Sequence, residues 1–441
     1  MEKLVRVIDV DEEKCVNCHR CINVCYVKYC NDGIGDFVDV DPNTCIGCGR
    51  CLEECPHDAR QFIDDFDSFM ADVKIEDDLI AIVAPSIVAN FPGNYLRINS
   101  WLKELGVKAV FDVSFGAELT VKSYLEHIKR NDPKSVIAQP CPAIVSYIEL
   151  YKPELLEFLA PADSPMVHIM KMIKEYYPAE YGDSKIAVLS PCLAKKREFE
   201  ATGIGDYNVT FKSLENYFEE EEIALEDYAE EEYDNPEAER AVLFSSPGGL
   251  METAARELPQ IVKKVRKIEG PEVIYHYIDH FTESLEKDVP PLLVDCLNCE
   301  LGCNGGTGTI NQKSNPDVLE TAVRKRSKKM KDYYRSQEEE GAAEKKLENI
   351  LDKYWKLGLY DREYKDLSDN IELDYPSQSE LEDIYQEMGK FDEAELYNCS
   401  SCGYDTCEEM AVAIYNGLNK KENCHFFLVD VFLQFKTLLG K

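Results

Sequence analysis

The sequence predicts an α/β protein, in which a central domain of parallel sheets flanked by helices lies between two small cysteine-rich domains. Short apolar runs rich in Val and Ile alternate with amphipathic stretches from residue 79 onward. Nine cysteines precede residue 60 and four follow residue 398. The alternation is typical of parallel sheet covered by helices, and the regular cysteine spacing indicates metal clusters.

Length and charge limit the classes of function. The 441 residues are enough for two to four domains. Asp and Glu total 84 against 49 Lys and Arg, a net charge of −35 that argues against nucleic acid or anionic membrane as a partner. No apolar run has the length of a signal peptide or a membrane span, so we expect a cytoplasmic protein. In a reducing compartment its 18 cysteines indicate metal sites rather than disulfides.

The first domain, residues 1–63, opens with a predicted strand at 4–10 and then carries C-x2-C-x2-C-x3-C twice. This is the bacterial two-cluster ferredoxin pattern, in which the fourth cysteine of each set ligates the other cluster. Zinc is the alternative for paired C-x2-C motifs, but it does not explain a triple spacing that occurs twice. The pattern assigns Cys15, Cys18, Cys21 and Cys55 to one [4Fe–4S] cluster, and Cys45, Cys48, Cys51 and Cys25 to a second. Cys30 is left over and is expected to be a small buried hydrophobe.

An acidic linker near residues 64–78 precedes the central domain, residues 79–335. Strands are predicted at 79–86, 107–114, 134–140, 185–190, 240–246 and 290–296, with helices at 118–130 and 164–177 among the connections. The carboxyl ends of parallel strands present loops to a shared crevice. Cys141, Cys192 and Cys299 each follow a predicted strand, so we expect them to converge on one cofactor.

Two charged stretches are predicted to differ in structure. The acidic stretch 217–240 is expected to be a solvent-facing helix or loop. Residues 317–389 are expected to be helical, and 336–390 to connect the domains. Their basic run, VRKRSKKMK at 323–331, could receive an acidic electron-transfer protein, although a solvated helix face explains it more simply.

The last domain, residues 391–441, has a close C-x2-C-x4-C trio and a fourth cysteine beyond a predicted helix. Cys399, Cys402, Cys407 and Cys424 can therefore enclose a third [4Fe–4S] cluster. Zinc is the alternative here, because four thiolates suit either metal.

Residues from about 80 to 335 resemble the catalytic domain of the [FeFe]-hydrogenases. The cluster-binding signatures of that family have their counterparts in QPCP, SPCLAKKRE and CELGCNGG, and VFDVSFGAELT, YKPELLEFLAPADSP and SPGGLMETAAR resemble three further segments. The ferredoxin run resembles an accessory domain common in the family. The C-terminal segment resembles a small iron–sulfur domain of its more divergent members.

The resemblance implies an H-cluster, which is a [4Fe–4S] cubane linked through one cysteine to a diiron unit with carbonyl, cyanide and dithiolate ligands. Cys141, Cys192 and Cys299 would hold the cubane, and Cys303 would hold its last iron and bridge to the diiron unit. Cys296 would stand outside the set, with a structural role.

Three further residues match the surroundings of the diiron unit in that family. Lys195 matches the lysine that hydrogen-bonds a cyanide, and Glu198 is expected to pair with it. Ser86 matches a serine near the other end of the diiron unit.

The departures from the family pattern affect proton transfer. Pro140 replaces the relay cysteine, and proline has no ionisable group. Ser190 replaces a methionine, and Ser123 and Tyr124 replace an acidic pair; Glu126 lies nearby, but nothing in the sequence shows that it substitutes. We therefore expect hydrogen binding or slow turnover, unless another relay exists.

Three functions follow as hypotheses. The chain is a slow hydrogenase that exchanges electrons with ferredoxin or another electron-transfer protein, or a hydrogen sensor that reports to a signalling or redox partner. The third hypothesis is a non-catalytic iron–sulfur carrier or assembly protein without the diiron unit, against which Lys195 and Ser86 argue. A homo-oligomer is compatible with each of them.

Overall fold

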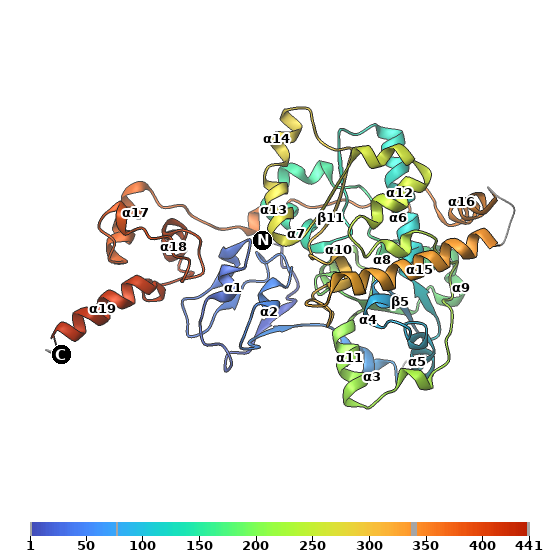
Figure 1. The fold of residues 1–441 in the computed structure, drawn as a ribbon, viewed down its shortest axis with the longest axis horizontal. Coiled ribbons are helices and arrows are strands. Elements are labelled where there is room, and N and C mark those ends of the chain that lie inside the picture. Colours follow the sequence, from blue (N-terminus) through green and yellow to red (C-terminus); the bar gives the residue numbers. More distant parts are fainter. Residues whose placement is uncertain (1, 76–77, 337–341, 439–441) are drawn as a thin grey trace. The chain divides into compact units, whose positions relative to one another are not determined.

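The computed structural model describes residues 2–75, 78–336 and 342–438 and divides into two compact units (Figure 1). The terminal unit combines Met1–Ile63 with Leu367–Lys441, and the central unit is Asp64–Asp366. The two cysteine-rich ends of the chain therefore fold together. In the described part of the chain, no helix combines the length and apolarity that a bilayer crossing requires.

Two parallel sheets form the framework of the central unit. The first has the order β6-β5-β8-β9 and the second the order β10-β11-β7, with every pairing parallel. The strands are β5 Leu79–Val83, β6 Val110–Asp112, β7 Val136–Ile137, β8 Lys185–Ser190, β9 Tyr207–Thr210, β10 Val265–Glu269 and β11 Leu293–Leu297. Every residue of β5 is buried, as expected of a strand covered on both faces. The predicted fold class is confirmed.

Helices connect and cover these strands. Their bounds are α3 Phe66–Asp72, α4 Ile87–Asn90, α5 Arg97–Leu105, α6 Val113–Asn131, α7 Pro142–Tyr151, α8 Pro165–Tyr176, α9 Pro178–Tyr181, α10 Lys195–Thr202, α11 Phe211–Glu220, α12 Gly249–Glu257, α13 Pro271–Asp279, α14 Phe281–Glu286, α15 Pro316–Ser336 and α16 Ala342–Tyr354. The main core lies between the four-stranded sheet and its helices, where Trp101, Phe111 and Val188 are buried together. The helices predicted at 118–130 and 164–177 are present as α6 and α8.

Three strand predictions were wrong or missing. The run at 240–246 forms a 3₁₀ helix, Ala241–Leu243, whose apolar side chains are buried. A short apolar run has the same appearance in a buried helix and in a buried strand, so composition alone misassigned it. The strands β9 and β10 were missed, because β9 is short and β10, at the edge of its sheet, is largely polar and accessible.

The acidic segment after residue 63 is structured rather than a linker. It contains α3, and Asp64 accepts hydrogen bonds from Thr210 Oγ1 at 2.7 Å and Ser213 Oγ at 2.6 Å. Asp65 accepts from the Asn208 backbone N–H at 3.0 Å. These carboxylates fasten the segment to β9 and α11, which composition could not show.

The stretch predicted as helical at 317–389 is only partly so. It contains α15, α16 and α17, Gln378–Glu387, but most of 355–377 is irregular. The acidic stretch 217–240 contains the end of α11 and otherwise mainly loop, as expected.

The terminal unit is built from small elements. Its strands pair antiparallel as β1 Ile8–Val10 with β4 Arg60–Phe62, and β2 Asn31–Asp32 with β3 Asp39–Val40. The N-terminal helices are α1 Arg20–Asn23 and α2 Arg50–Glu53, and the C-terminal segment adds α17, α18 Cys407–Tyr415 and α19 His425–Leu438.

Buried Asp295, on β11, predicts a pH-dependent stability. Burial raises the pKa of its carboxyl from 3.8 to about 7, although the Met251 N–H that donates to it at 3.0 Å acts in the opposite direction. An acid whose folded-state pKa is raised loses stability as pH rises from the unfolded value to the folded one. Asp295→Asn is therefore expected to raise the free energy of unfolding by about 1 kcal/mol or more at about pH 8.

Urea unfolding at acid and at alkaline pH measures this difference. The control is Asp183→Asn at an exposed position, which should change stability at neither pH. An Asp295→Asn effect that is the same at both pH values would contradict the assignment.

Candidate metallocofactor site

One cavity of the central unit brings together the residues that the sequence predicts for the central cofactor. It contains about 650 Å³ of space not filled by protein atoms, and its lining includes Ser86, Pro140, Cys141, Cys192, Lys195, Cys299 and Cys303. These residues lie on segments up to 217 positions apart in the chain. The predicted convergence is therefore present in the fold.

The parallel strands explain this convergence. Ser86 and Cys192 follow β5 and β8 of the four-stranded sheet, whereas Cys141 and Cys299 follow β7 and β11 of the three-stranded sheet. Each is within four residues of the carboxyl end of its strand. The cavity is thus lined by loops at the carboxyl ends of both sheets, the position where α/β proteins commonly bind ligands.

Helix N-termini provide a favourable field at two of these cysteines. Cys141 is the N-cap of α7, and α10 begins three residues after Cys192. The N-terminal end of a helix carries a partial positive charge, which stabilises nearby anions. A thiolate-ligated cluster with net negative charge is favoured at this position.

The loop 299–308 reaches the cavity because it contains glycine. A Cβ on Gly306 would lie 2.3 Å from the Pro191 carbonyl oxygen, so only glycine allows the loop to approach the Cys192 segment this closely. Gly308 N–H donates to the same carbonyl at 2.9 Å, and Cys303 N–H donates to the Ser245 carbonyl at 2.8 Å. These contacts hold Cys303 in the wall of the cavity that Cys192 also lines.

The protein environment keeps these thiols protonated when no cation is bound. Burial, with the neighbouring thiols, raises the pKa of both Cys192 and Cys303 to about 12. Thiolate is the form that binds metal, and metal ions displace the thiol proton. The site is therefore suited to a cationic metal centre that compensates several buried thiolates.

Lys195 is held by a buried ion-pair network. Its Nζ donates to Glu198 Oε2 at 2.5 Å and to the Pro140 carbonyl at 3.1 Å, which confirms the predicted pairing with Glu198. Arg362 Nη1 donates to Glu198 Oε1 at 2.7 Å, and Ser164 Oγ donates to Glu198 Oε2 at 2.9 Å. Burial alone would raise the pKa of Glu198, but Lys195 and Arg362 bring it below its usual value. Sequence reasoning did not identify Arg362, because it lies 164 residues from its partner along the chain.

Glu198→Gln is expected to destabilise the central unit strongly. The variant leaves Lys195 and Arg362 buried without their common carboxylate, and breaking a buried pair in this way typically costs about 3–5 kcal/mol. The stabilisation is present above the pKa of the carboxyl in the unfolded chain and is lost as pH falls through the folded value. Urea unfolding of the metal-free protein at neutral pH measures it.

An exposed carboxylate supplies the control for this prediction. Glu283 pairs with Lys287 on the surface, so Glu283→Gln should leave the unfolding midpoint unchanged. Equal midpoints for Glu198→Gln and the unsubstituted chain would show that the buried network contributes no stability.

Two unpaired hydroxyls in the cavity indicate that a polar ligand fits there. Ser86 Oγ and Ser245 Oγ line it, are buried, and have no hydrogen-bond partner within the described residues. An unpaired buried hydroxyl costs free energy unless a ligand pairs with it. Four cysteines, a lysine and two unpaired hydroxyls suit a thiolate-bound cluster whose outer ligands accept hydrogen bonds.

The residues at the proton-relay positions take other roles. Pro140 lines the cavity, and Glu126 instead lines a separate surface cavity, where it pairs with Arg130 at 3.0 Å. Ser123 Oγ lies 3.0 Å from His168 Nε2 and accepts from Trp355 Nε1 at 2.9 Å. Buried Tyr124 accepts a long hydrogen bond from the Gln139 backbone at 3.4 Å. Glu126 therefore does not substitute for the missing relay at the cavity.

Cys296 stands outside the cavity lining, as predicted. Its side chain is buried on β11, and its thiol donates to the Ala138 carbonyl at 3.4 Å.

Some residues that line the cavity were not predicted, among them Ser245, Asn298, Phe244 and Met166. Tyr275 holds Asn298 through a 2.6 Å hydrogen bond, and Asn298 contacts Cys299 Sγ at 3.7 Å. The asparagine between Leu297 and Cys299 was the signal that could have identified a thiolate hydrogen-bond donor.

Cys25 lies near the second set of N-terminal cysteines, as the crossed spacing predicts. Burial is the largest cause of the raised pKa of Cys48 and of Cys51, and nearby Cys25 and Cys45 contribute to both. Cys15 and Cys18 likewise contribute to the raised pKa of Cys21. The Cys21 sulfur accepts a hydrogen bond from Arg60 Nη2 at 3.1 Å. Cys25 therefore lies with the second set of cysteines rather than the first. The spare Cys30 is buried, with its sulfur 3.8 Å from that of Cys25.

The C-terminal cysteines also meet at one cavity. Cys399, Cys402, Cys407 and Cys424 line it together. Within the described residues, no three His, Cys, Asp or Glu side chains lie close enough to share a single metal ion. A four-iron cluster is larger than a single ion and takes ligands that stand farther apart.

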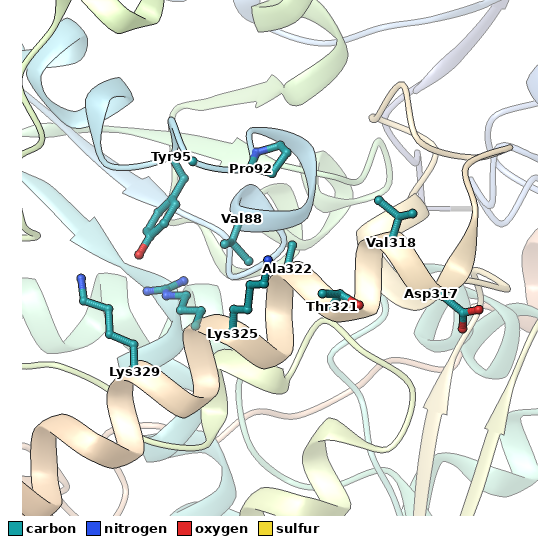
Figure 2. A pocket seen from close by; sticks show the side chains of 11 residues that line it. Val88, Pro92, Tyr95, Asp317, Val318, Thr321, Ala322, Lys325 and Lys329 are labelled. Carbon is teal, nitrogen blue, oxygen red and sulfur yellow. The ribbon is translucent and has the colours of Figure 1, made fainter.

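Another cavity without cysteines lies between the α4 region and α15 (Figure 2). Tyr95, Val88 and Pro92 face Lys325 and Lys329 of the basic run across it. Arg326 of the same run is buried and pairs with Asp112 at 2.5 Å. Part of the run therefore supports the fold, and its role toward an electron-transfer protein stays a prediction.

Comparison with known proteins identifies the family. The sequence profile of the iron-only hydrogenase large subunit, C-terminal domain, matches residues 77–307, more than half of the chain. The chain belongs to this family. Profiles of a 4Fe-4S binding domain and a putative Fe-S cluster domain match residues 38–61 and 397–426. The iron–sulfur assignment of both ends of this hydrogenase-family chain is thereby supported.

Individual relatives match over a limited length. Iron hydrogenase 1 of Clostridium pasteurianum is 30% identical over 178 residues, which are 36% of this chain and 31% of the relative. The NADP-reducing hydrogenase subunit HndD of Solidesulfovibrio fructosivorans is 28% identical over 35% of this chain and 31% of its own. The nuclear prelamin A recognition factor of Mus musculus is 26% identical over 30% and 34%. The matched region thus spans about a third of each relative.

Solved structures show the same fold at low sequence identity. An [FeFe]-hydrogenase studied for oxygen degradation of its 2Fe subcluster has a TM-score of 0.54 and 19% identity, covering 69% of this chain and 99% of its own. A variant of HydA1 from Chlamydomonas reinhardtii has a TM-score of 0.52 and 18% identity, covering 69% and 100%. This likeness establishes the fold.

Proposed function

We propose that this hydrogenase-family protein binds an H-cluster in the central cavity and slowly interconverts hydrogen with two protons and two electrons. The observation that carries the proposal is one cavity lined by four cysteines, Lys195 and Ser86. Pro140 also lines it, at the position where the family resemblance expects the proton-relay cysteine. Electrons would pass through the N-terminal clusters to ferredoxin or another electron-transfer protein.

Different cavity residues would bind different parts of the cofactor. Cys141, Cys192, Cys299 and Cys303 would supply four thiolates, and the bound group would supply the iron at which hydrogen is split. Lys195 lines the cavity, and its ammonium is held by Glu198 and the Pro140 carbonyl. The hydroxyls of Ser86 and Ser245 also line the cavity and are free to bind polar ligands.

The wall of this cavity has few groups that can transfer a proton. Among the described residues that line it, the ionisable side chains are the four cysteines assigned to iron and Lys195. Lys195 is engaged by Glu198, and Pro140 has no proton to exchange. Loss of a general acid or base typically slows a reaction about 10²- to 10⁴-fold.

Pro140 also favours a second function, hydrogen sensing. A sensor needs to bind hydrogen and change redox state, but does not need rapid proton release. The output would then reach a signalling or redox partner through the iron–sulfur clusters. A third function, as a non-catalytic carrier or assembly protein, would use the cysteines and the structural ion pair of Lys195, but would leave the buried Ser86 hydroxyl without a ligand.

Infrared spectroscopy after maturation tests the proposal. We expect bands of iron-bound carbonyl and cyanide in the loaded protein. Absence of these bands from a protein with full iron–sulfur content would leave the non-catalytic function. If the bands appear, hydrogen-uptake kinetics separate slow turnover from binding alone.

A further inference from the structure

The C-terminal cysteine loop packs directly on the N-terminal helix that carries cluster cysteines. Gly403 follows Cys402 with φ +93°, and a Cβ there would lie 2.6 Å from the Cβ of Ile22 and 2.9 Å from the His19 carbonyl oxygen. Ile22 lies on α1 next to Cys21 and three residues before Cys25. The backbone beside one set of cysteines therefore contacts the segment that supplies ligands to both N-terminal clusters.

A buried lysine joins the same two segments. Lys28 Nζ donates to the Asn23 carbonyl at 3.0 Å and to the Gly403 carbonyl at 3.2 Å. It also pairs with Asp405 at 3.2 Å. The amine thus connects the end of α1 to the loop between Cys402 and Cys407, and places a positive charge between the two cysteine sites.

Further contacts make this interface extensive. The rings of Tyr29 and Tyr404 stack with centroids 5.8 Å apart. Gly33 N–H donates to the Leu418 carbonyl at 2.8 Å, and Asn423 Nδ2 donates to the Gly33 carbonyl at 2.9 Å. Such a network of directional, partly buried bonds is typical of a permanent contact.

We propose that the C-terminal cysteine site and the ferredoxin-like clusters form one electron-transfer unit, with the contact of Gly403 on α1 as the electron path. This inference rests on the proposed function only in requiring iron–sulfur clusters at both sites. With clusters bound at both sites, each transfer would move one electron from one cluster to the other, without proton movement or bond cleavage. Tunnelling falls steeply with distance, so the direct contact of the Gly403 backbone with Ile22 and the His19 carbonyl is the favourable route.

Charge and exposure support this role. A positive charge near a cluster favours its reduced state, because reduction adds a negative charge, and Lys28 contacts the loop between Cys402 and Cys407. Of the four C-terminal cysteines, Cys399 is exposed and the other three are buried. An external one-electron carrier can therefore approach the C-terminal site, whereas a zinc ion there would interrupt the chain of redox centres.

Low-temperature electron paramagnetic resonance of the reconstituted, fully reduced full-length chain tests the contact. Two reduced clusters in close contact broaden each other's signals. The two N-terminal clusters broaden each other in every variant, so we expect a further broadening from the C-terminal cluster in the unsubstituted chain. This further broadening should be lost in Gly403→Trp, where the indole displaces the loop from Ile22. Gly417→Trp is the matched control, since Gly417 also has positive φ but a Cβ there would meet nothing within 4 Å.

A redox titration of Lys28→Met provides a second measure if Gly403→Trp loads iron poorly. We expect a more negative midpoint potential for the neighbouring cluster, and no shift for Lys436→Met on exposed α19. A further broadening that is absent, or that persists in Gly403→Trp, overturns the inference, as does zinc at the C-terminal site or an unchanged potential in Lys28→Met. None of these results alters the infrared bands, which decide the proposed function separately.

Discussion

Pro140→Cys is expected to raise the rate of hydrogen uptake about 10²-fold or more, up to the 10⁴-fold that a general acid or base can contribute. Pro140 lines the cofactor cavity immediately before Cys141, so a thiol at this position would face the same space. It would add the one ionisable group that the cavity wall lacks beyond the proposed ligands and Lys195. The assay is hydrogen-dependent dye reduction by protein matured to equal infrared band intensity.

Pro140→Ala is the matched control, because it removes the ring without adding a proton carrier. It also preserves the backbone carbonyl that accepts from Lys195 at 3.1 Å. We expect its rate to stay near that of the unsubstituted chain. If the cysteine and alanine variants have the same rate, the account of the missing relay is wrong and the limiting step lies elsewhere.

Cys303→Ser is expected to abolish loading of the diiron unit. Cys303 is fixed at the cavity by the hydrogen bond from its N–H to Ser245, and the resemblance assigns it the bridge between the two parts of the cofactor. A serine hydroxyl is a poor ligand for iron that thiolates bind. The carbonyl and cyanide bands should disappear, while the signals of the N-terminal clusters should remain.

Cys296→Ser provides a control of the same chemistry three residues before Cys299. Its sulfur lies outside the cavity and contacts the Ala138 carbonyl. The band intensity should therefore be retained in this variant. Bands that survive in Cys303→Ser but vanish in Cys296→Ser would reverse the assignment of ligand and structural cysteine.

Local sequence determined those parts of the molecule whose chemistry depends on neighbouring residues. The spacing of Cys15 to Cys55 indicated the crossed cluster groups, and the placement of Cys25 agrees with it. Lys195 and Glu198 are three apart on α10, a separation at which helical side chains meet. The Val- and Ile-rich runs predicted parallel sheet, because buried strands need continuous apolar side chains.

The same local reasoning failed where packing selects between alternatives. The apolar run ending at Ser246 became a 3₁₀ helix, and polar β10 became a strand at a sheet edge. Neither choice is determined by periodicity, since burial and pairing with β11 come from residues far along the chain.

The sequence by itself predicted which cysteines are metal ligands and, through the family resemblance, that Pro140 interrupts the expected proton relay. Only the tertiary structure decided that loops from two separate sheets meet at one cavity, that Arg362 completes the network of Glu198, and that Glu126 lies elsewhere. It also decided that Gly403 rests on α1, which joins the two cysteine-rich ends in one unit. Ligand spacing is a property of a few consecutive residues, whereas these contacts join residues more than 100 positions apart and form only when the elements pack.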